Sequence, residues 1–369
     1  MQGEHQFSNN KLFFYADRLK TSLSGRVANP IVYELSLSGF CNCSCEYCCC
    51  QNYHSNNMLL QQDIDIIVTQ LKSVDAKAVT LTGGGEPLTN PLFSYCVKKL
   101  NENDLRVGVI TNGILLNDEA IKNIVKCASF VRISLDTVDK DAYKSIRGID
   151  IELDKMFNNL KALAKYKKKV KSEILIGCQI VYFNQSISDV KKTVNFVKKS
   201  GIDFIQIRPV DNIPQEDLKR NYDFYIKNRA GLKKLVNKYS DNNFSVILND
   251  NKFEEYYNSS VTKEYSKCLG ANFTASIGHD MNLYFCCSHI GNLTFSVGNL
   301  RERSLIELLA DSKRKSLIEN PCFSYCQTQC RNHNINKILN DLSKMDAEQL
   351  DILINEKNRE PQPIHCDFL

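Results

Sequence analysis

The 369-residue chain has 43% hydrophobic and 24% charged residues, which is an ordinary globular composition and excludes disordered and fibrous proteins. Its length predicts two domains. The net charge of +5 is small, and the basic residues form no stripe with a reader motif, so nucleic acid is an unlikely partner. The chain has no apolar run long enough for a membrane helix and its beginning lacks a signal-peptide pattern, so we expect a cytoplasmic protein that does not bind membranes.

Strand-like and helical patterns alternate along the first two thirds of the chain. We expect strands at residues 31–37, 78–82, 106–111, 130–135, 174–182 and 204–208, and helices at 62–74, 91–101, 118–127, 154–166 and 187–199. This alternation is typical of βαβ units with a parallel sheet. We therefore predict an α/β fold, a partial (β/α)6 barrel, that binds its ligands at the carboxyl ends of the strands.

The pattern changes near residue 241. A short strand is expected at 244–248, a stretch punctuated by Gly and Asn at 269–300, and helices at 304–318 and 346–356. We divide the chain into an N-terminal extension (1–29), the barrel (30–235), a linker (236–262), a small cysteine-rich α+β domain (263–340) and a C-terminal helix and tail (341–369).

The 16 cysteines are the unusual feature of the composition. Without an export signal they are expected to be reduced thiols, for which metal binding or redox chemistry is a better explanation than disulfide bonds. Twelve of them fall into two groups, at residues 41–50 and 268–330. This grouping predicts metal sites.

The first group follows the first predicted strand and places six cysteines within ten residues. Cys41, Cys45 and Cys48 alone have the spacing C-x3-C-x2-C. Three thiolates on one loop can hold three irons of a [4Fe–4S] cluster and leave the fourth iron open, as a catalytic site requires. The alternative is a zinc knuckle in which Cys43, Cys49 or Cys50 supplies a fourth ligand.

This loop, with Tyr47 before its last cysteine, resembles the radical S-adenosylmethionine (SAM) superfamily. The resemblance covers residues 30–210 and includes three further segments at strand ends: Gly84-Gly85-Glu86-Pro87, Thr111-Asn112-Gly113, and Ser134-Leu135-Asp136 with Arg147 downstream. It implies that the three cysteines hold the cluster and that Gly84, Gly85, Glu86 and Pro87 hold the methionine amino group. By the same resemblance, Asn112 and Asp136 lie in SAM-binding segments, and Ser134 and Arg147 bind the methionine carboxylate.

The second group consists of Cys268, the pair Cys286-Cys287, and Cys322, Cys326 and Cys330. Four thiolates would also suit tetrahedral zinc. The order of cysteines and glycine turns resembles the auxiliary-cluster domain of radical SAM enzymes, called SPASM in its long form and twitch in its short form. The resemblance implies one auxiliary [4Fe–4S] cluster, for which we favour Cys268, Cys286, Cys326 and Cys330 and leave Cys322 open.

Further candidates lie outside these motifs. Cys178 is a candidate to face the barrel interior and donate a hydrogen atom to a substrate radical, with a buried structural thiol as the alternative. Arg208 is a candidate for the cavity wall, with an ion pair at the strand end as the alternative. His365 and Asp367, in the tail, are candidates for substrate contact.

The resemblance implies an enzyme that reductively cleaves SAM and abstracts hydrogen from an unactivated C–H bond, with an electron donor such as flavodoxin or ferredoxin. Only about 30 residues precede the predicted barrel, which are too few for a peptide-binding domain, so we expect a small polar substrate. The alternatives are a ribosomally made peptide as substrate and, from a different class, a non-catalytic zinc-binding interaction protein.

Overall fold

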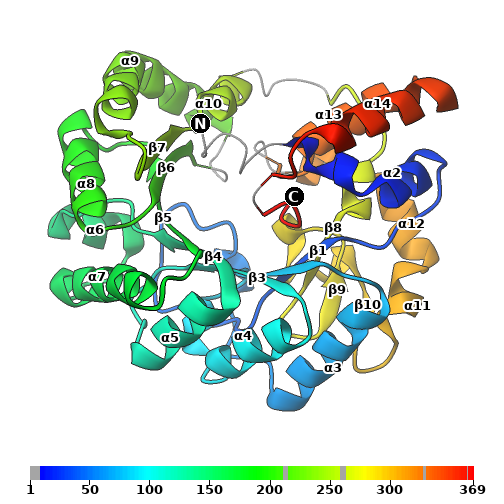
Figure 1. Ribbon diagram of the computed structural model, residues 1–369, viewed down its shortest axis with the longest axis horizontal. Helices are drawn as coiled ribbons and strands as arrows, with labels where there is room; N and C mark the ends of the chain where they lie inside the picture. The colour runs from blue at the N-terminus through cyan, green and yellow to red at the C-terminus, as the bar shows by residue number, and fades with distance from the viewer. Residues whose placement is uncertain (1–8, 211–214, 258–262, 327–329, 364) are drawn as a thin grey trace.

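The computed structural model describes residues 9–210, 215–257, 263–326, 330–363 and 365–369 (Figure 1). One curved sheet runs through it in the strand order β10-β9-β8-β1-β2-β3-β4-β5-β6-β7. Strand β1 pairs in parallel with β2 and with β8, and parallel pairing continues from β2 to β7. The strands are β1 (Val32–Leu35), β2 (Ala78–Leu81), β3 (Arg106–Thr111), β4 (Ala128–Ser134), β5 (Leu175–Tyr182), β6 (Phe204–Pro209), β7 (Ser245–Leu248), β8 (Thr274–Ile277), β9 (Asn282–Tyr284) and β10 (Ser296–Asn299).

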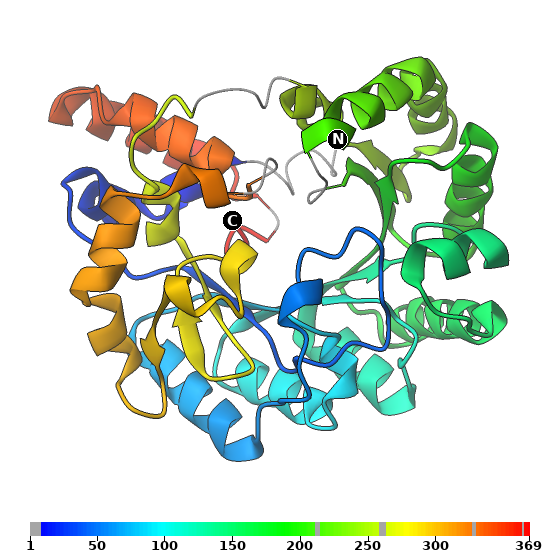
Figure 2. The ribbon, with the colours of Figure 1, turned by 180° about the vertical axis from the view of Figure 1, so that it is seen from behind.

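Helices connect successive parallel strands on the outer face of the sheet (Figures 1 and 2). They are α3 (Gln61–Ser73), α4 (Phe93–Glu102), α5 (Asp118–Cys127), α6 (Lys140–Arg147), α7 (Leu153–Val170), α8 (Ile187–Lys199), α9 (Gln215–Tyr239) and α10 (Asp250–Tyr257). The C-terminal part adds α11 (Leu305–Leu309), α12 (Ser312–Glu319), α13 (His333–Leu342) and α14 (Ala347–Arg359), and α2 (Ala16–Leu23) precedes β1. The part of the chain that the structure describes has no helix of the length and apolarity needed to cross a membrane.

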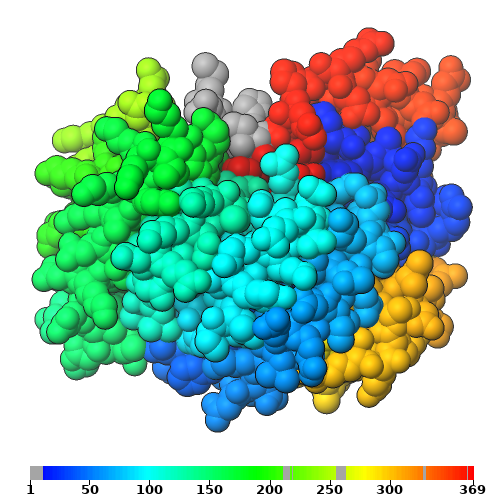
Figure 3. All heavy atoms as spheres, turned by 60° about the horizontal axis from the view of Figure 1, so that its bottom comes forward, coloured from blue at the N-terminus to red at the C-terminus, as the bar shows by residue number. Residues whose placement is uncertain are grey.

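The main hydrophobic core lies between the sheet and these helices. Alternate strand residues such as Leu35, Val109, Ile133 and Ile205 are fully buried and pack against the apolar faces of the helices. Figure 3 shows how the helices between β2 and β5 close this face of the molecule. The opposite residues of the same strands face the concave side of the sheet, where polar side chains collect.

The sheet is wider than the predicted six strands. The end of helix α9, strand β7 and helix α10 lie in the segment that we expected to be a linker, and β7 pairs with β6 through Phe204 and Ser245. The expectation of a linker is wrong because the apolar run around Val246 is long enough to extend the parallel sheet. On the other edge, the pairing of β8 with β1 joins the C-terminal cysteine-rich region to the barrel.

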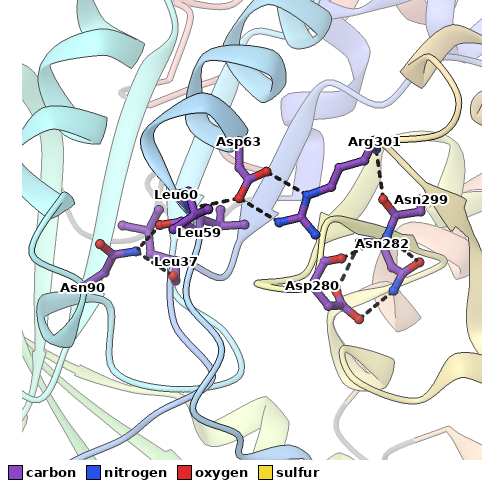
Figure 4. Close-up of polar contacts among 9 residues, drawn as sticks. All are labelled: Leu37, Leu59, Leu60, Asp63, Asn90, Asp280, Asn282, Asn299 and Arg301. Atoms are coloured by element: carbon purple, nitrogen blue, oxygen red, sulfur yellow. Dashed lines mark hydrogen bonds and ion pairs between the residues drawn. The ribbon is translucent and has the colours of Figure 1, made fainter.

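An ion pair fastens helix α3 to the segment after β10 (Figure 4). The buried carboxylate of Asp63 accepts hydrogen bonds from Nε and Nη2 of Arg301 at 2.9 and 2.8 Å, and from the backbone amide of Leu60. Burial alone would raise the pKa of Asp63, but the hydrogen bonds from Arg301 and Leu60 outweigh it and lower the pKa. The backbone amide of Arg301 in turn donates a hydrogen bond to the side-chain oxygen of Asn299.

We predict that Asp63→Ala lowers the free energy of unfolding by about 2 kcal/mol, because it removes charge-assisted hydrogen bonds to a buried carboxylate. The loss should be full at neutral pH and shrink as the pH falls through the lowered pKa of Asp63, since the unfolded chain takes up the proton first. Urea unfolding followed by circular dichroism measures both effects. Asp341→Ala is the matched control, because its pair with Lys344 is exposed and should contribute less than about 0.5 kcal/mol. Equal losses in both variants would contradict the prediction.

Candidate functional site

The first cysteine group lies on a long loop that leaves the carboxyl end of β1. The base of this loop is closed by the Gly39 amide, which donates to Asn57 O at 2.8 Å, and by the Ser55 amide, which donates to Gly39 O at 3.0 Å. The start of the loop is also bound to the neighbouring glycine loop, because the amide of Gly85 donates to Ser38 O at 2.9 Å. The loop is therefore fixed at the same sheet edge as the loop after β2.

The thiols of this loop lie in a protected environment. Cys45 is buried, and Cys41 and Cys48 are half-buried. A hydrogen bond from the Cys43 thiol lowers the pKa of Cys45 to about 6, and the positive charge of Arg147 acts in the same direction, against burial. A hydrogen bond from Cys43 also lowers the pKa of Cys41, whereas burial raises that of Cys48 to about 11.

Across the described ranges, no three His, Cys, Asp or Glu side chains converge on one metal-ion position. A cubane cluster does not need such convergence, because each thiolate binds a different iron. Three thiols on one loop, two of them with lowered pKa values, are a donor set that fits a [4Fe–4S] cluster.

Behind the cysteine loop lies a buried ion pair. Arg147 Nη2 is 2.6 Å from Asp136 Oδ2, and both side chains are almost completely buried. Arg147 Nη1 donates to Cys45 Sγ at 3.5 Å, and the guanidinium lies over the ring of Tyr47, whose hydroxyl donates to Asp136. Helix α6 ends at Gly148, which has a left-handed backbone conformation and lies against the cysteine loop. A Cβ atom on Gly148 would lie 2.5 Å from Ser44 O. Two predicted site residues, Asp136 and Arg147, are thus brought together beside Cys45.

The loop after β2 needs its glycines. Gly83 has a φ of +107°, and a Cβ atom on Gly85 would lie 2.2 Å from Phe40 O. Glu86 is buried, and its carboxylate accepts hydrogen bonds from the amides of Leu88 and Asn112 and from the Thr111 hydroxyl. Its pKa is raised by burial, against these hydrogen bonds. The Glu86 side chain therefore joins the loops after β2 and β3, while Pro87 begins a short 3-10 helix, Pro87–Thr89.

The remaining predicted SAM-binding residues line the same edge. Asn112 donates to Asn42 Oδ1 at 2.7 Å and to Cys43 Sγ at 3.5 Å, which links the end of β3 to the cysteine loop. Ser134 at the end of β4 pairs in register with Gln179 of β5. Gln179 Oε1 and Arg147 Nε are buried and have no hydrogen-bond partner. A ligand with amino, hydroxyl and carboxylate groups would satisfy such atoms, so this edge fits SAM.

His279 was not singled out from the sequence, yet it connects the two halves of the site. It lies in the turn between β8 and β9, where its Nε2 is 3.0 Å from Ser55 Oγ and its Nδ1 is 3.3 Å from Ser36 Oγ. Cβ atoms on Gly39 or Gly84 would approach its ring to 2.6 and 3.2 Å. Burial lowers its pKa and favours the neutral ring. The signal available in the sequence was a histidine directly after a glycine turn.

The second cysteine group gathers beside β8 and β9. Cys268 and Cys286 are buried in one small cluster with Phe285 and Phe295. Burial raises the pKa of both thiols, and the charge of Cys330 adds to the effect on each. Cys326 also acts on Cys268, Cys287 acts on Cys286, and Cys322 acts on Cys326, so all six thiols of this group lie near one another.

Exposure distinguishes Cys322 from the other five cysteines of this group. The Cys322 side chain is exposed and its Sγ is 3.1 Å from Ser324 Oγ. The pKa of Cys287 is raised by burial and by the charges of Glu34, Cys330 and Cys49, so this thiol lies toward the first cysteine loop.

The predicted orientation of Cys178 is wrong. Cys178 pairs in register with Ile133 and Ile205, and all three are fully buried in the core between sheet and helices. The concave face takes Gly177 and Gln179 instead. Arg208 lies two residues beyond Gln206 and thus faces the same side of β6 as Gln206.

The C-terminal tail packs into the concave side of the sheet (Figures 1 and 2). Phe368 makes an edge contact with Phe130 of β4, with 4.9 Å between ring centroids. Asp367 accepts a hydrogen bond from Tyr15 and is 3.8 Å from Arg106, so its carboxylate has structural partners. His365 lies against Phe130, and its buried Nε2 has no hydrogen-bond partner.

Comparisons with known proteins agree with this geometry. A family model described as the radical SAM superfamily matches residues 35–197. A GTP 3',8-cyclase from Clostridium perfringens is 30% identical over 185 residues, which are 48% of this chain and 55% of the relative, so the chain spans about half the length of that curated relative. A probable GTP 3',8-cyclase from Sulfurisphaera tokodaii is 25% identical over 79% of this chain and 94% of its own length.

Solved structures share the fold at low identity. Streptococcus suis SuiB bound to the precursor peptide SuiA has a TM-score of 0.61 and 17% identity, over 82% of this chain and 70% of SuiB. The protein anSMEcpe with bound AdoMet and a peptide has a TM-score of 0.52 and 17% identity, over 89% of this chain and 99% of its own. The radical SAM superfamily is thus the family whose model this chain matches, over residues 35–197.

Proposed function

We propose that this protein is an enzyme that binds a [4Fe–4S] cluster through Cys41, Cys45 and Cys48 and reductively cleaves SAM. The observation that carries the proposal is the C-x3-C-x2-C loop within the radical SAM domain, at the sheet edge where Gln179 and Arg147 keep unpaired polar atoms. When bound, the cluster and SAM supply a 5'-deoxyadenosyl radical that abstracts hydrogen from a C–H bond. A one-electron donor such as flavodoxin or ferredoxin would reduce the protein.

The surrounding residues bind and orient SAM in this proposal. Gly84 and Gly85 leave the backbone free to contact the methionine amino group, and Glu86 and Pro87 hold that loop in place. Ser134 and Arg147 receive the carboxylate, while Asp136 keeps Arg147 charged and oriented through the buried ion pair. Asn112 positions the cysteine loop through Asn42.

We further propose that Cys268, Cys286, Cys326 and Cys330 hold an auxiliary cluster. Their shared environment beside β8 and β9 supports this set over Cys322, whose side chain is exposed. Because β8 pairs with β1, such a cluster would lie in a region that is bound directly to the strand before the first cysteine loop. The residues around it, Phe285 and Phe295, exclude water from the thiols.

For the substrate, we propose a small polar molecule. The relatives with 25–30% identity are named for a reaction of GTP, a small polar molecule. A peptide is the second candidate, because the fold also resembles that of SuiB, which was solved with a precursor peptide.

We predict that replacing Cys41, Cys45 and Cys48 together by Ala abolishes 5'-deoxyadenosine formation with dithionite and leaves about four of about eight irons per chain. Iron and acid-labile sulfide analysis and chromatography of the products measure the two effects. Cys127→Ala, at the end of helix α5, is the control and should retain both properties. If the triple variant still cleaved SAM, Cys43, Cys49 or Cys50 would have to be a ligand. Zinc in place of iron in anaerobically purified protein would favour the interaction protein.

We predict that replacing Cys268 and Cys286 together by Ala halves the iron content but leaves SAM cleavage without substrate intact. The physical reason is that the main-chain pairing of β8 with β1, which supports the SAM-binding edge, does not involve these thiols, because Cys268 precedes β8 and Cys286 follows β9. Metal binding also contributes folding energy, so the segments that carry the two thiols should become more accessible to hydrogen exchange, whereas β8 should stay protected by its pairing with β1. A full iron content in the double variant would contradict the auxiliary-cluster assignment.

A further inference from the structure

His279 brings the C-terminal region of the chain to the SAM-binding edge. Strand β8 pairs in parallel with β1 as far as Ile277, and the amide of Ser36 then donates to the Ile277 carbonyl at 3.0 Å. His279 follows Ile277 by two residues, and its buried side chain lies beside Ser36, just before the first cysteine loop. A residue that is 243 positions away from Ser36 in the sequence therefore takes part in this site.

The turn that carries His279 is held by its own hydrogen bonds. The amide of Gly278 donates to the carbonyl of Asn282 at 2.9 Å. The carboxylate of Asp280 accepts hydrogen bonds from the Asn282 amide at 3.1 Å and from the Tyr284 hydroxyl at 2.6 Å. The contact between Asp280 and Asn282 is drawn in Figure 4. His279 thus projects from a rigid turn, as a side chain that positions other groups requires.

The hydroxyl of Ser36 has three polar neighbours and only one hydrogen. Ser36 Oγ accepts a hydrogen bond from the Gly84 amide at 3.1 Å and donates one to the Ser38 carbonyl at 3.1 Å. His279 Nδ1 lies 3.3 Å from the same oxygen. Because a hydroxyl offers one hydrogen and two lone pairs, a proton on Nδ1 fills the second lone pair and completes the hydrogen bonding of Ser36.

The other ring nitrogen of His279 agrees with this tautomer. Burial lowers the pKa of the ring, so it is neutral and carries one proton. With this proton on Nδ1, Nε2 accepts from the hydroxyl of Ser55 at 3.0 Å, and Ser55 Oγ accepts from the Asn57 amide at 3.3 Å. With the proton on Nε2, Ser36 would have to donate its single hydrogen to Nδ1 and would lose its bond to Ser38. The tautomer protonated on Nδ1 therefore satisfies all of these contacts.

We propose that His279 is a positioning residue of the SAM site and acts, as the tautomer protonated on Nδ1, through Ser36 on the amide of Gly84. The inference rests on the proposed function, in which the Gly84 loop receives the methionine amino group of SAM. The ring also packs directly on this loop, since a Cβ atom on Gly84 would lie 3.2 Å from Nδ1. Removal of the Nδ1–H group would leave a buried lone pair of Ser36 unpaired and loosen the acceptor of the Gly84 amide.

The test is SAM binding to the full-length, cluster-reconstituted protein, measured by isothermal titration calorimetry without oxygen. The side-chain amide of Asn occupies the position of Nδ1, and that of Gln occupies the position of Nε2. We therefore expect His279→Gln to weaken SAM binding about tenfold and His279→Asn to stay within about threefold of the wild type. Unchanged affinity in His279→Gln, or an equal or greater loss in His279→Asn, would overturn the proposal.

Variants of the two serines separate the two contacts of His279. Ser36→Ala should weaken SAM binding about tenfold, whereas Ser55→Ala, which leaves the Nδ1 contact in place, should change it less than about threefold. Equal affinities in these two variants would overturn the proposal even if His279→Gln did not fold.

A double variant shows whether His279 acts through Ser36. If it does, Ser36→Ala/His279→Gln should bind SAM no more weakly than Ser36→Ala alone, because the contact is already lost in the single variant. Losses that multiply in the double variant would mean that His279 acts on the site by another route, and they would contradict the proposal.

His333→Gln is the matched control. It removes a histidine–hydroxyl contact of the same kind in the C-terminal region, between Nδ1 of His333 and the hydroxyl of Tyr265 at 2.9 Å. This variant should keep its SAM affinity within about twofold of the wild type. A loss as large as that in His279→Gln would assign the effect to general loosening of the C-terminal region and refute the positioning role.

Formation of 5'-deoxyadenosine by the wild type tests the proposed function independently. SAM binding without cleavage would refute only the enzyme assignment. Cleavage together with equal SAM affinity in the wild type and His279→Gln would refute only the positioning role, and a wild type that does not bind SAM would overturn both.

Discussion

The parallel pairing of β1 with strands on both of its sides determines most of what the molecule can do. Val32 to Leu35 are hydrogen-bonded to β2 in one direction and to β8 in the other. Because the carboxyl ends of parallel strands meet at one edge, the cysteine loop after β1, the glycine loop after β2 and the turn after β8 are neighbours. A strand that is 242 residues away in the chain, counted from Val32 to Thr274, therefore helps to build the first site.

The pairing of β8 with β1 brings His279 to the first cysteine loop. Its imidazole lies between two hydroxyl groups, on Ser36 and Ser55, and the two glycines beside it, Gly39 and Gly84, leave room for the ring. The C-terminal region thus supports both loops that the proposed SAM site requires. Any rearrangement of the second cysteine group that moved β8 or its turn would also displace the first cysteine loop, because His279 contacts Ser36 and Ser55.

Much of the fold could be predicted from the sequence because the strands and helices have clear periodic patterns. It was harder to predict which residues of each strand face the helices and which face the concave side of the sheet. In β5 the run Ile176 to Tyr182 is apolar on both faces except at Gln179, so Cys178 was placed on the wrong side, whereas Gln179 itself marks the concave face. The widths of the sheet and of the small domain depend on pairing between distant segments, such as β1 with β8, which local patterns do not reveal.

The candidate site likewise has residues that local motifs predict and residues that only the structure identifies. Motifs at fixed spacing found Cys41, Cys45, Cys48 and the glycine loop, because their chemistry depends on neighbours in the chain. The role of Glu86 as a link between loops and the contact of His279 depend on residues that are far apart in sequence, so they required the structure. The tail was expected to offer His365 and Asp367 to a substrate, but Tyr15 and Arg106 bind Asp367.

The two-sided pairing of β1 also means that the part of the chain that matches the radical SAM model is not a separable unit. In a chain shortened to end before β8, the amides of Val32 and Ser36 would lose their acceptors on Phe273 and Ile277. The buried side chains of Tyr33 and Leu35 would then stand beside an open strand edge. Such an edge is a template for pairing with other chains, so removal of the C-terminal region would turn an interior strand of the sheet into an aggregation surface.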